Sequence, residues 1–375
     1  MIRILHLFDD NSGWQERVGA SQLIDRLPVE RFTSRAAAMS GRVRRWVLPG
    51  GQCVDLWSQC WGIDFLGAPA ARRYLQDQRV DLIHAWGIRA ALAAAAVGAD
   101  TTPIVIELFD PGLSDRQAKM LRSIAGAGRF AIVCSTQTVR RCLVEKGLEA
   151  DRCVVIRPGV DFALINAARR SDLRGRLGLS RTDRVLIAPE PATRRGGHFT
   201  AFWTTGVRSF LEPHVRLIIP GQSPEQARVA RLAGQVGLSH LLCCPGEGVP
   251  CEELIAIADA MLVPSSGEVP TTGIAWAMAA GVPVLATAVY ATAEMLADRH
   301  NGLLVKPDSF KRVALRLVTR LDDRRQLAAV SETARGQAYQ IFGLRRCVDQ
   351  HARLYENLLA ARLPADGITD SAVDV

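Results

Sequence analysis

The 375-residue chain lacks several features that would assign it to a simple class. It has no apolar stretch of the roughly 18 residues that a membrane-spanning helix requires. Its nine cysteines are scattered, without a CxxC pair or the histidine spacing of a zinc site, which indicates reduced and mostly buried thiols. It also has no run of basic residues long enough for a nucleic-acid-binding arm. We therefore expect neither a metal nor a nucleic acid as a partner.

Basic residues outnumber acidic residues in the chain. The formal net charge of +8 favours an anionic partner, such as a diphosphate or an anionic membrane surface. In a predicted helix at Ser114–Ile124, basic residues recur at helical spacing. Peripheral contact with an anionic membrane is therefore a secondary hypothesis, beside a plain solvated helix face. Met1–Phe8 is too short for the apolar region of a signal peptide and runs into Asp9, so we expect a cytoplasmic location, with any peripheral contact at the inner face of the membrane.

Short β-rich apolar runs alternate with longer helical patterns along most of the chain. This alternation is typical of βαβ units and predicts an α/β fold with mostly parallel sheets. The expected strands are Ile2–Phe8, Val80–His84, Ile104–Leu108, Phe130–Cys134, Val154–Ile156, Val185–Ala188, Val215–Ile219, Leu241–Cys243, Ala260–Val263, Val284–Ala286 and Gly302–Val305. The segment Arg31–Trp61 is less regular, and its structure stays open.

The length favours two domains, since single cores seldom grow beyond about 250–300 residues. A polar, arginine-rich segment, Asn166–Arg184, interrupts the alternation, which then begins afresh. We expect an N-terminal domain over residues 1–165 and a C-terminal domain over residues 166–340. Residues 341–362 are predicted to form an amphipathic helix that packs back on the N-terminal domain, and residues 363–375 a flexible tail.

In parallel α/β sheets, ligands bind beyond the carboxyl ends of the strands. The loop after the first strand contains Gly13 but no GxGxxG pattern, which disfavours an NAD enzyme. Gly13 is either a turn glycine or a diphosphate contact. The loop that begins at Pro264 and Ser265 leads into an apolar helix, which Thr271 or Thr272 could cap. That helix start would favour a diphosphate through its N–H groups and dipole, although an ordinary capped helix fits the same pattern.

Several short phrases resemble glycosyltransferase family 4 of the GT-B fold, in the same order over almost the whole chain. They are the VDLIHAW phrase at 80–86, RPGVD at 157–161, WAMAAGVPVLAT at 276–287 and NGLLV at 301–305. The resemblance implies two Rossmann-like, doubly wound parallel-sheet domains that face a central cleft. It further implies a nucleotide-sugar held mainly by the C-terminal domain.

In the C-terminal domain, the family pattern places several donor-binding positions. The first member of its glutamate pair corresponds to Glu268, which would position the donor sugar, while Trp276 occupies the place of the second. Arg195 keeps one charge of the diphosphate clamp, and Arg194 beside it could supply another, whereas Glu190 stands where the family has a cation. The expected donor-binding residues are Gly13, Arg194, Arg195, Pro264, Ser265, Glu268, Thr271, Thr272 and Gly273.

In the N-terminal domain, Phe109 stands where the family has a sugar-contacting histidine, and Asp110 is retained. His84, at a strand end, is either a contact to sugar or acceptor or a structural residue. Glu107 could orient an acceptor hydroxyl or be a solvated loop carboxylate. The expected catalytic residues are Glu268, Arg195, His84 and Asp110.

The resemblance implies a retaining, metal-independent hexosyltransferase. Its co-substrate would be a nucleotide-diphosphate-sugar, with no other cofactor, and its acceptor a glycan, a lipid-linked molecule or a small molecule, as in cell-envelope polysaccharide synthesis. Two alternatives stay open. Trp276, Phe109 and Glu190 are compatible with an impaired nucleotide-sugar or glycan-binding paralogue, since a fold does not guarantee activity. A sugar-nucleotide epimerase would use the same donor without an acceptor.

Overall fold

The structure is a computed structural model that describes residues 1–9, 13–39, 46–47, 53–56, 73–98, 102–110, 112–125, 129–189, 192–246, 249–267 and 269–360. The chain forms two compact units. Unit 1 comprises Met1–Gly159 and the C-terminal segment that begins at Leu344, and unit 2 comprises Val160–Gly343. The sequence-based boundaries at residues 165 and 340 lie a few residues away from these positions.

Unit 1 is built on an eight-stranded sheet with the order β3-β4-β2-β1-β5-β6-β7-β8. All neighbouring strands are parallel except β3 and β4. The strands are β1 Ile2–Asp9, β2 Phe32–Met39, β3 Trp46–Val47, β4 Cys53–Leu56, β5 Leu82–Trp86, β6 Ile104–Leu108, β7 Phe130–Cys134 and β8 Cys153–Val155. The helices include α1 Trp14–Arg26, α3 Ile88–Gly98, α4 Asp115–Ala125, α5 Gln137–Glu145 and α15 Leu344–Leu359.

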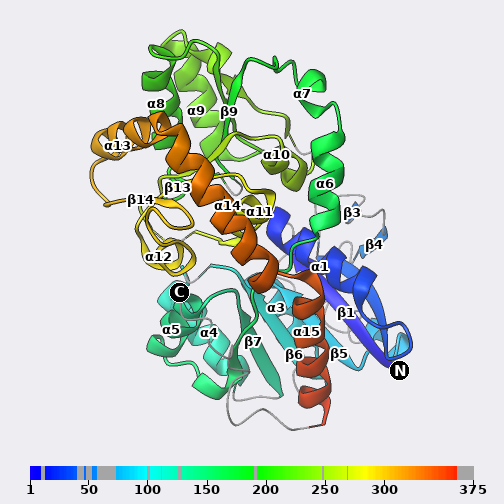
Figure 1. Cartoon of the computed structure of the whole chain (residues 1–375). Helices are drawn as coiled ribbons and strands as arrows, with labels where there is room; N and C mark the ends of the chain where they lie inside the picture. Colours follow the sequence, from blue (N-terminus) through cyan, green and yellow to red (C-terminus); the bar gives the residue numbers. More distant parts are fainter. Residues whose placement is uncertain are drawn as a thin grey trace. The chain divides into compact units, whose positions relative to one another are not determined.

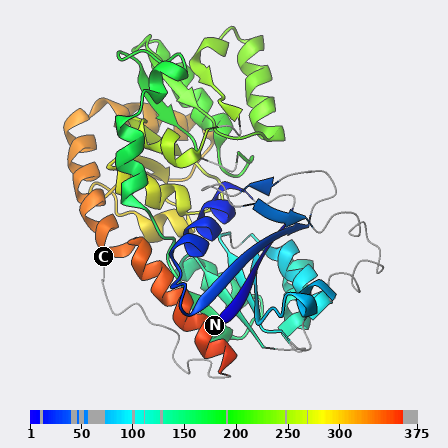
Figure 2. The same cartoon turned by 90° about the vertical axis from the view of Figure 1, so that its right-hand side faces the viewer.

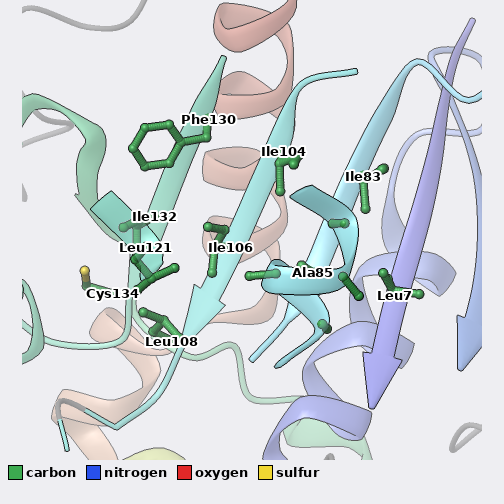
Figure 3. Packing of buried hydrophobic residues seen from close by; sticks show 14 of the residues in the cluster. Leu7, Ile83, Ala85, Ile104, Ile106, Leu108, Leu121, Phe130, Ile132 and Cys134 are labelled. Atoms are coloured by element: carbon green, nitrogen blue, oxygen red, sulfur yellow. The ribbon is translucent and has the colours of Figure 1, made fainter. Parts of the chain in front are cut away.

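The strands of unit 1 bury both of their faces, because helices cover the sheet on each side. Ile83 and Ile106 belong to the core on one face, together with residues of α3, α4 and α5 (Figure 3). Leu82 and Val105, one position away in their strands, belong to the core on the other face, with residues of α1 and α15. Figures 1 and 2 both show α15 lying along this sheet. The period of two in each strand thus decides which side chains meet α15.

Unit 2 is built on a six-stranded parallel sheet with the order β11-β10-β9-β12-β13-β14. The strands are β9 Arg184–Ile187, β10 Val215–Ile218, β11 Leu242–Cys243, β12 Ala260–Val263, β13 Val284–Thr287 and β14 Leu303–Val305. The helices are α6 Phe162–Arg170, α7 Leu173–Arg176, α8 His198–Ser209, α9 Pro224–Gln235, α10 Cys251–Ala256, α11 Thr272–Ala280, α12 Tyr290–Met295, α13 Phe310–Asp322 and α14 Arg324–Ile341.

Helix α11 is apolar on all sides, and every one of its residues is buried. A helix with no polar face must be covered on all sides, and α11 contacts α6, α10, α14 and β13. Its fixed position matters because its first residue follows the loop after β12. The start of α11 is therefore held at the carboxyl edge of the sheet.

The expected α/β fold is confirmed, and the expected strands are present with ends shifted by at most two residues. The open segment Arg31–Trp61 contributes β2, β3 and β4. Within the described residues, no helix combines the length and the apolarity needed to span a bilayer.

Candidate functional site

The strand order of unit 2 reverses between β9 and β12. β10 lies on one side of β9, and β12, which comes later in the chain, lies on the other. At such a switch point the loops after the two strands diverge and leave a crevice, where ligands of open α/β sheets bind. Apart from Glu268, which is outside the described residues, the expected donor residues of unit 2 lie in these two loops and at the start of α11.

Backbone contacts hold the two loops together. The N–H of Ser266 donates a hydrogen bond to the carbonyl oxygen of Arg195 at 2.8 Å. Gly197 has a φ of +79°, and a Cβ at this position would lie 2.0 Å from the carbonyl oxygen of Pro264. Only glycine permits both this backbone conformation and this close approach. The Arg-Arg-Gly-Gly sequence at 194–197 thus folds one loop tightly against the other.

His198 fixes the same loop from within. Its Nε2 lies 2.9 Å from the carbonyl oxygen of Pro189, and its Nδ1 lies 3.4 Å from that of Thr193. Burial lowers the pKa of His198, so a neutral ring near pH 7 is favoured; that ring can donate to only one of the two carbonyl oxygens, and the shorter contact, to Pro189, suits it better. The hydroxyl of Thr193 accepts a hydrogen bond from the N–H of Gly196 at 2.9 Å. The loop that carries Arg194 and Arg195 is therefore braced at both ends.

The start of α11 meets this loop closely. A Cβ on Gly273 would lie 3.0 Å from Cβ of Pro189, so glycine lets the helix start approach the end of β9. Thr271 occupies the N-cap position, but its side chain makes no capping hydrogen bond. The hydroxyl oxygens of Thr271 and Thr272 are both buried without a hydrogen-bond partner. Unsatisfied buried hydroxyls are costly in a folded protein, so this pair has unused hydrogen-bonding capacity at the helix start.

A cavity of about 470 Å³ lies beside the two loops. Three expected donor residues line it, namely Arg194, Pro264 and Ser265. Its other walls include two aromatic rings, Phe199 and Phe310, whose centroids are 5.1 Å apart in an edge-to-face arrangement. A polar loop wall and an aromatic wall in one cavity suit a ligand with both phosphate and ring parts.

The charges at this cavity are partly paired. Arg228, which also lines it, donates to Glu225 Oε1 at 2.6 Å and places its Cζ 5.2 Å from the centroid of the Phe199 ring. The Arg228 guanidinium holds the pKa of Glu225 below its ordinary value. Nε of Arg194 lies 4.0 Å from the same carboxylate, but the Arg194 side chain is 83% exposed. Arg194 is therefore accessible to an incoming anion.

Arg195 lies along the neighbouring loop. Its Cδ is 3.6 Å from the position that a Cβ of Gly267 would occupy. Within the described part of the chain, no carboxylate forms an ion pair with Arg195. Glu190 and Glu268 lie outside the described residues. Trp276, at the place of the family's second glutamate, is fully buried within α11 and does not line the described cavity.

The expected residues of unit 1 lie on different elements. Gly13 is the N-cap residue of α1, with a φ of −80° that any residue adopts. Asp110 is exposed and accepts a hydrogen bond from the N–H of Gly112 at 2.7 Å, in a local turn at the end of β6. Phe109 is buried and stacks on Trp86, with ring centroids 6.3 Å apart. Of these residues, Asp110 alone is exposed at the carboxyl edge of the sheet.

His84 is not exposed at a strand end. Strand β5 continues to Trp86, and His84 is fully buried, with its Nδ1 2.8 Å from the hydroxyl oxygen of Tyr355. This placement favours the structural alternative for His84. Glu107 is likewise buried in β6, which corrects the interpretation of a solvated loop carboxylate.

Sequence reasoning missed Glu16, Phe199 and Arg228. Burial raises the pKa of Glu16 to about 7. Glu16 follows the expected residue Gly13 by three positions in the chain. Phe199 follows the Arg-Arg-Gly-Gly turn by two positions, which is a usable sequence signal. Arg228 comes from α9 and reaches the cavity only through the packing of α9 beside α8, so its local sequence gave no signal.

Two family models match this chain. The model described as Glycosyltransferase Family 4 matches residues 20–164, and the model described as Glycosyl transferases group 1 matches residues 205–337. The D-inositol 3-phosphate glycosyltransferase of Acidothermus cellulolyticus is 28% identical over 299 residues, which cover 75% of this chain and 62% of the relative. The N-acetyl-alpha-D-glucosaminyl L-malate synthase of Bacillus anthracis is 26% identical over 148 residues, which cover 40% of this chain and 39% of the relative. Both alignments thus span less than two thirds of the relative.

Solved structures share the fold over nearly the whole chain. HepE of Anabaena, solved in complex with UDP-glucose, superimposes with a TM-score of 0.77 at 19% identity, covering 95% of this chain and 100% of that protein. Sucrose-phosphate synthase from Thermosynechococcus elongatus gives a TM-score of 0.77 at 16% identity, covering 96% and 100%. These likenesses confirm the GT-B fold. Since the two family matches together take in more than half of the residues and the fold agrees, the chain belongs to glycosyltransferase family 4.

Proposed function

We propose that the protein is a retaining glycosyltransferase that moves a hexose from a nucleotide-diphosphate-sugar to an acceptor hydroxyl. One observation carries the proposal. The loop of Arg194 and Arg195 is bonded to the loop after β12 at the switch point of unit 2, and the start of α11 adds two buried hydroxyls without a partner. These features together suit a diphosphate.

In this proposal the donor diphosphate lies at the start of α11. The free N–H groups and the positive dipole end of the helix attract it, and the Thr271 and Thr272 hydroxyls donate to its oxygens. Arg195 and the accessible Arg194 supply positive charge. The fold neighbour HepE of Anabaena was solved with UDP-glucose, so UDP-hexoses are the first donors to test.

The reaction needs little from the protein beyond positioning and charge. The bond between the anomeric carbon and the diphosphate oxygen breaks, and the acceptor oxygen bonds to the same face of that carbon. The acceptor proton passes to the departing diphosphate oxygen. Arg195 and the start of α11 stabilise the negative charge that develops there, and Glu268 is proposed to hold the donor sugar. We propose that this transfer is independent of a metal ion.

For the acceptor side, we propose that Asp110 orients the reacting hydroxyl. The acceptor is a glycan, a lipid-linked molecule or a small molecule, with cell-envelope polysaccharides as one such class. Helix α4 exposes Arg116, Lys119 and Arg122, which supports peripheral contact with an anionic membrane. Co-sedimentation with anionic and neutral vesicles tests this contact, and equal binding to both kinds of vesicle would contradict it.

Calorimetric titration tests the donor site. Wild-type protein is titrated with UDP, GDP and ADP and with UDP-glucose, and compared with Arg195→Ala. We expect binding of one diphosphate series and at least about tenfold weaker binding by the variant, as for loss of a charge-assisted contact. Arg231→Ala is the matched control, because Arg231 is an exposed arginine on α9, outside the loops after β9 and β12 and outside the start of α11. Undiminished binding by Arg195→Ala would overturn the assignment of the diphosphate site.

Product analysis separates the alternatives. The fully buried Trp276, in the place of a ribose-binding carboxylate, favours an impaired binding paralogue as the second candidate. That candidate predicts donor binding without transfer to any acceptor of a glycan panel. An epimerase would convert the donor sugar in the absence of acceptor.

A further inference from the structure

Three chemically active side chains meet inside the core of unit 1, apart from the loops discussed above. They are His84 on β5, Glu107 on β6 and His351 on α15, and none is more than 4% exposed. Nε2 of His84 lies 3.3 Å from Oε2 of Glu107, and Nε2 of His351 lies 3.2 Å from the same oxygen. The proposed glycosyl transfer uses none of them.

Strand alternation and the helix face bring the three side chains together. β5 and β6 are parallel neighbours, with His84 opposite Val105 and Trp86 opposite Glu107. His84 and Glu107 therefore point to the face of the sheet that α15 covers. On α15, His351 and Tyr355 are one helical turn apart and both are buried against that face.

Each histidine has its other ring nitrogen occupied. Nδ1 of His84 lies 2.8 Å from the Tyr355 hydroxyl, and Nδ1 of His351 lies 2.9 Å from the carbonyl oxygen of Cys347. The carbonyl can only accept, so His351 carries a proton on Nδ1 and presents Nε2 to the carboxylate. Metal-binding histidines typically have this arrangement, in which an outer partner fixes the ring and leaves one nitrogen for the ion.

Two imidazole nitrogens in and beside this group lack a well-formed hydrogen bond. The buried Nε2 of His84 forms an ion-pair contact with Oε2 of Glu107 at 3.3 Å, but its geometry is poor for a hydrogen bond. His6 lies beside it, with ring centroids 5.4 Å apart. Trp86 donates to Nδ1 of His6 at 3.2 Å, which leaves the buried Nε2 of His6 without a partner. Two neighbouring imidazole nitrogens in this core thus have hydrogen-bonding capacity that the protein uses poorly or not at all.

The spacing of the three atoms suits one small ion. One potential ligand atom from each of the three residues lies within 4.8 Å of those of the other two. A tetrahedral ion with bonds of about 2.0–2.1 Å keeps its ligand atoms about 3.4 Å apart, close to the two distances of 3.2 and 3.3 Å found here. Two imidazoles and one carboxylate suit zinc and related transition metals, whereas calcium and magnesium prefer oxygen ligands alone.

We propose that His84 Nε2, Glu107 Oε2 and His351 Nε2 bind one divalent transition-metal ion of the zinc class, which fastens α15 to the sheet of unit 1. The role is structural and separate from transfer. The competing explanation is a proton on His351, which would make a buried imidazolium–carboxylate pair with no ion.

Metal analysis of untagged, full-length protein tests the site. The protein is stripped with a chelator, dialysed and titrated with Zn²⁺ and, separately, with Co²⁺. We expect one equivalent of either ion, a visible Co²⁺ absorption of a tetrahedral site, and a Tm that rises by several degrees with Zn²⁺. Less than about a tenth of an equivalent, with no Tm change, would overturn the proposal.

Two variants locate the ion. Glu107→Gln and His351→Gln should lose the Co²⁺ absorption and the Tm rise, while the exposed-histidine control His240→Gln retains both. Circular dichroism and nucleotide binding by unit 2 report whether each variant is folded. Full binding of Zn²⁺ by a folded His351→Gln would also refute the site. The wild-type titration decides the matter if both variants fail to fold, and none of these results depends on whether the protein transfers sugar.

Discussion

The N–H of Ser266 donates a hydrogen bond to the carbonyl oxygen of Arg195, at 2.8 Å. This backbone contact joins the loop after β9 to the loop after β12, on the two sides of the switch point. The Arg195 side chain takes no part in this contact, because only the backbone carbonyl accepts the hydrogen bond. Backbone geometry therefore sets the position of the proposed diphosphate clamp. Even a small change in that geometry should weaken diphosphate binding strongly.

Gly197→Ala should destabilise the protein and weaken diphosphate binding. The new Cβ would stand 2.0 Å from the Pro264 carbonyl oxygen at a φ of +79°, so strain and a clash act together. We expect a loss of about 2 kcal/mol or more in the free energy of unfolding, measured by urea denaturation. Gly178→Ala is the matched control, because Gly178 has a φ of +68° but nothing within 4 Å. Equal losses in the two variants would show that the contact with Pro264 is unimportant.

Thr272→Val should leave stability nearly unchanged but weaken binding of the nucleoside diphosphate. The Thr272 hydroxyl is buried without a protein partner, so an apolar replacement of the same shape removes an unsatisfied group. Thr204→Val is the control. Its buried hydroxyl donates to the Thr200 carbonyl oxygen at 2.8 Å, and its loss should cost about 1 kcal/mol of stability with no change in affinity. If Thr272→Val bound the diphosphate as wild type does, the hydroxyl would have no part in the site.

Glu225→Gln should strengthen diphosphate binding. Glu225 holds Arg228 at 2.6 Å and stands 4.0 Å from Arg194, so its carboxylate competes for the cations of the cavity. Its removal should tighten binding roughly threefold, or about 0.6 kcal/mol, as expected for a partly screened charge. Calorimetry at low and high salt measures the effect, which should shrink with salt. Glu253→Gln, which removes the carboxylate 3.9 Å from Arg176, is the control, and weaker binding by Glu225→Gln would contradict the idea of competition.

Glu16 should make stability depend on pH near neutrality. Burial raises its pKa to about 7 in the folded protein, above the ordinary value of 4.5. The folded state then holds the proton more tightly than the unfolded state. The contribution of Glu16 to stability is therefore fully present below about pH 4.5 and is lost as the pH rises through about 7. Urea denaturation across this range should show a smaller fall for Glu16→Gln than for wild type, with Glu30→Gln as an exposed control; identical slopes would contradict the prediction.

The strands were predictable because their apolar runs are short and bounded by polar turns. Ile104–Leu108 was placed with both ends correct. β2, with the sequence FTSRAAAM, was not, since three alanines give no β-branched signal. His84 was placed at a strand end because the expected strand stopped two residues before β5 does. Because of this difference of two residues, His84 is predicted at the sheet edge but lies in the core.

The α/β class could be predicted from the sequence because strand and helix periodicity is a local property, and the resemblance of short motifs implied the GT-B organisation. The role of Arg194 and Arg195 in donor binding stays a prediction. Which side chains meet in space depends on the tertiary structure. Strand order brought the loops after β9 and β12 together, and α15 carried His351 to Glu107 across 244 positions of the chain. Such contacts depend on packing between distant elements, and no local pattern encodes them.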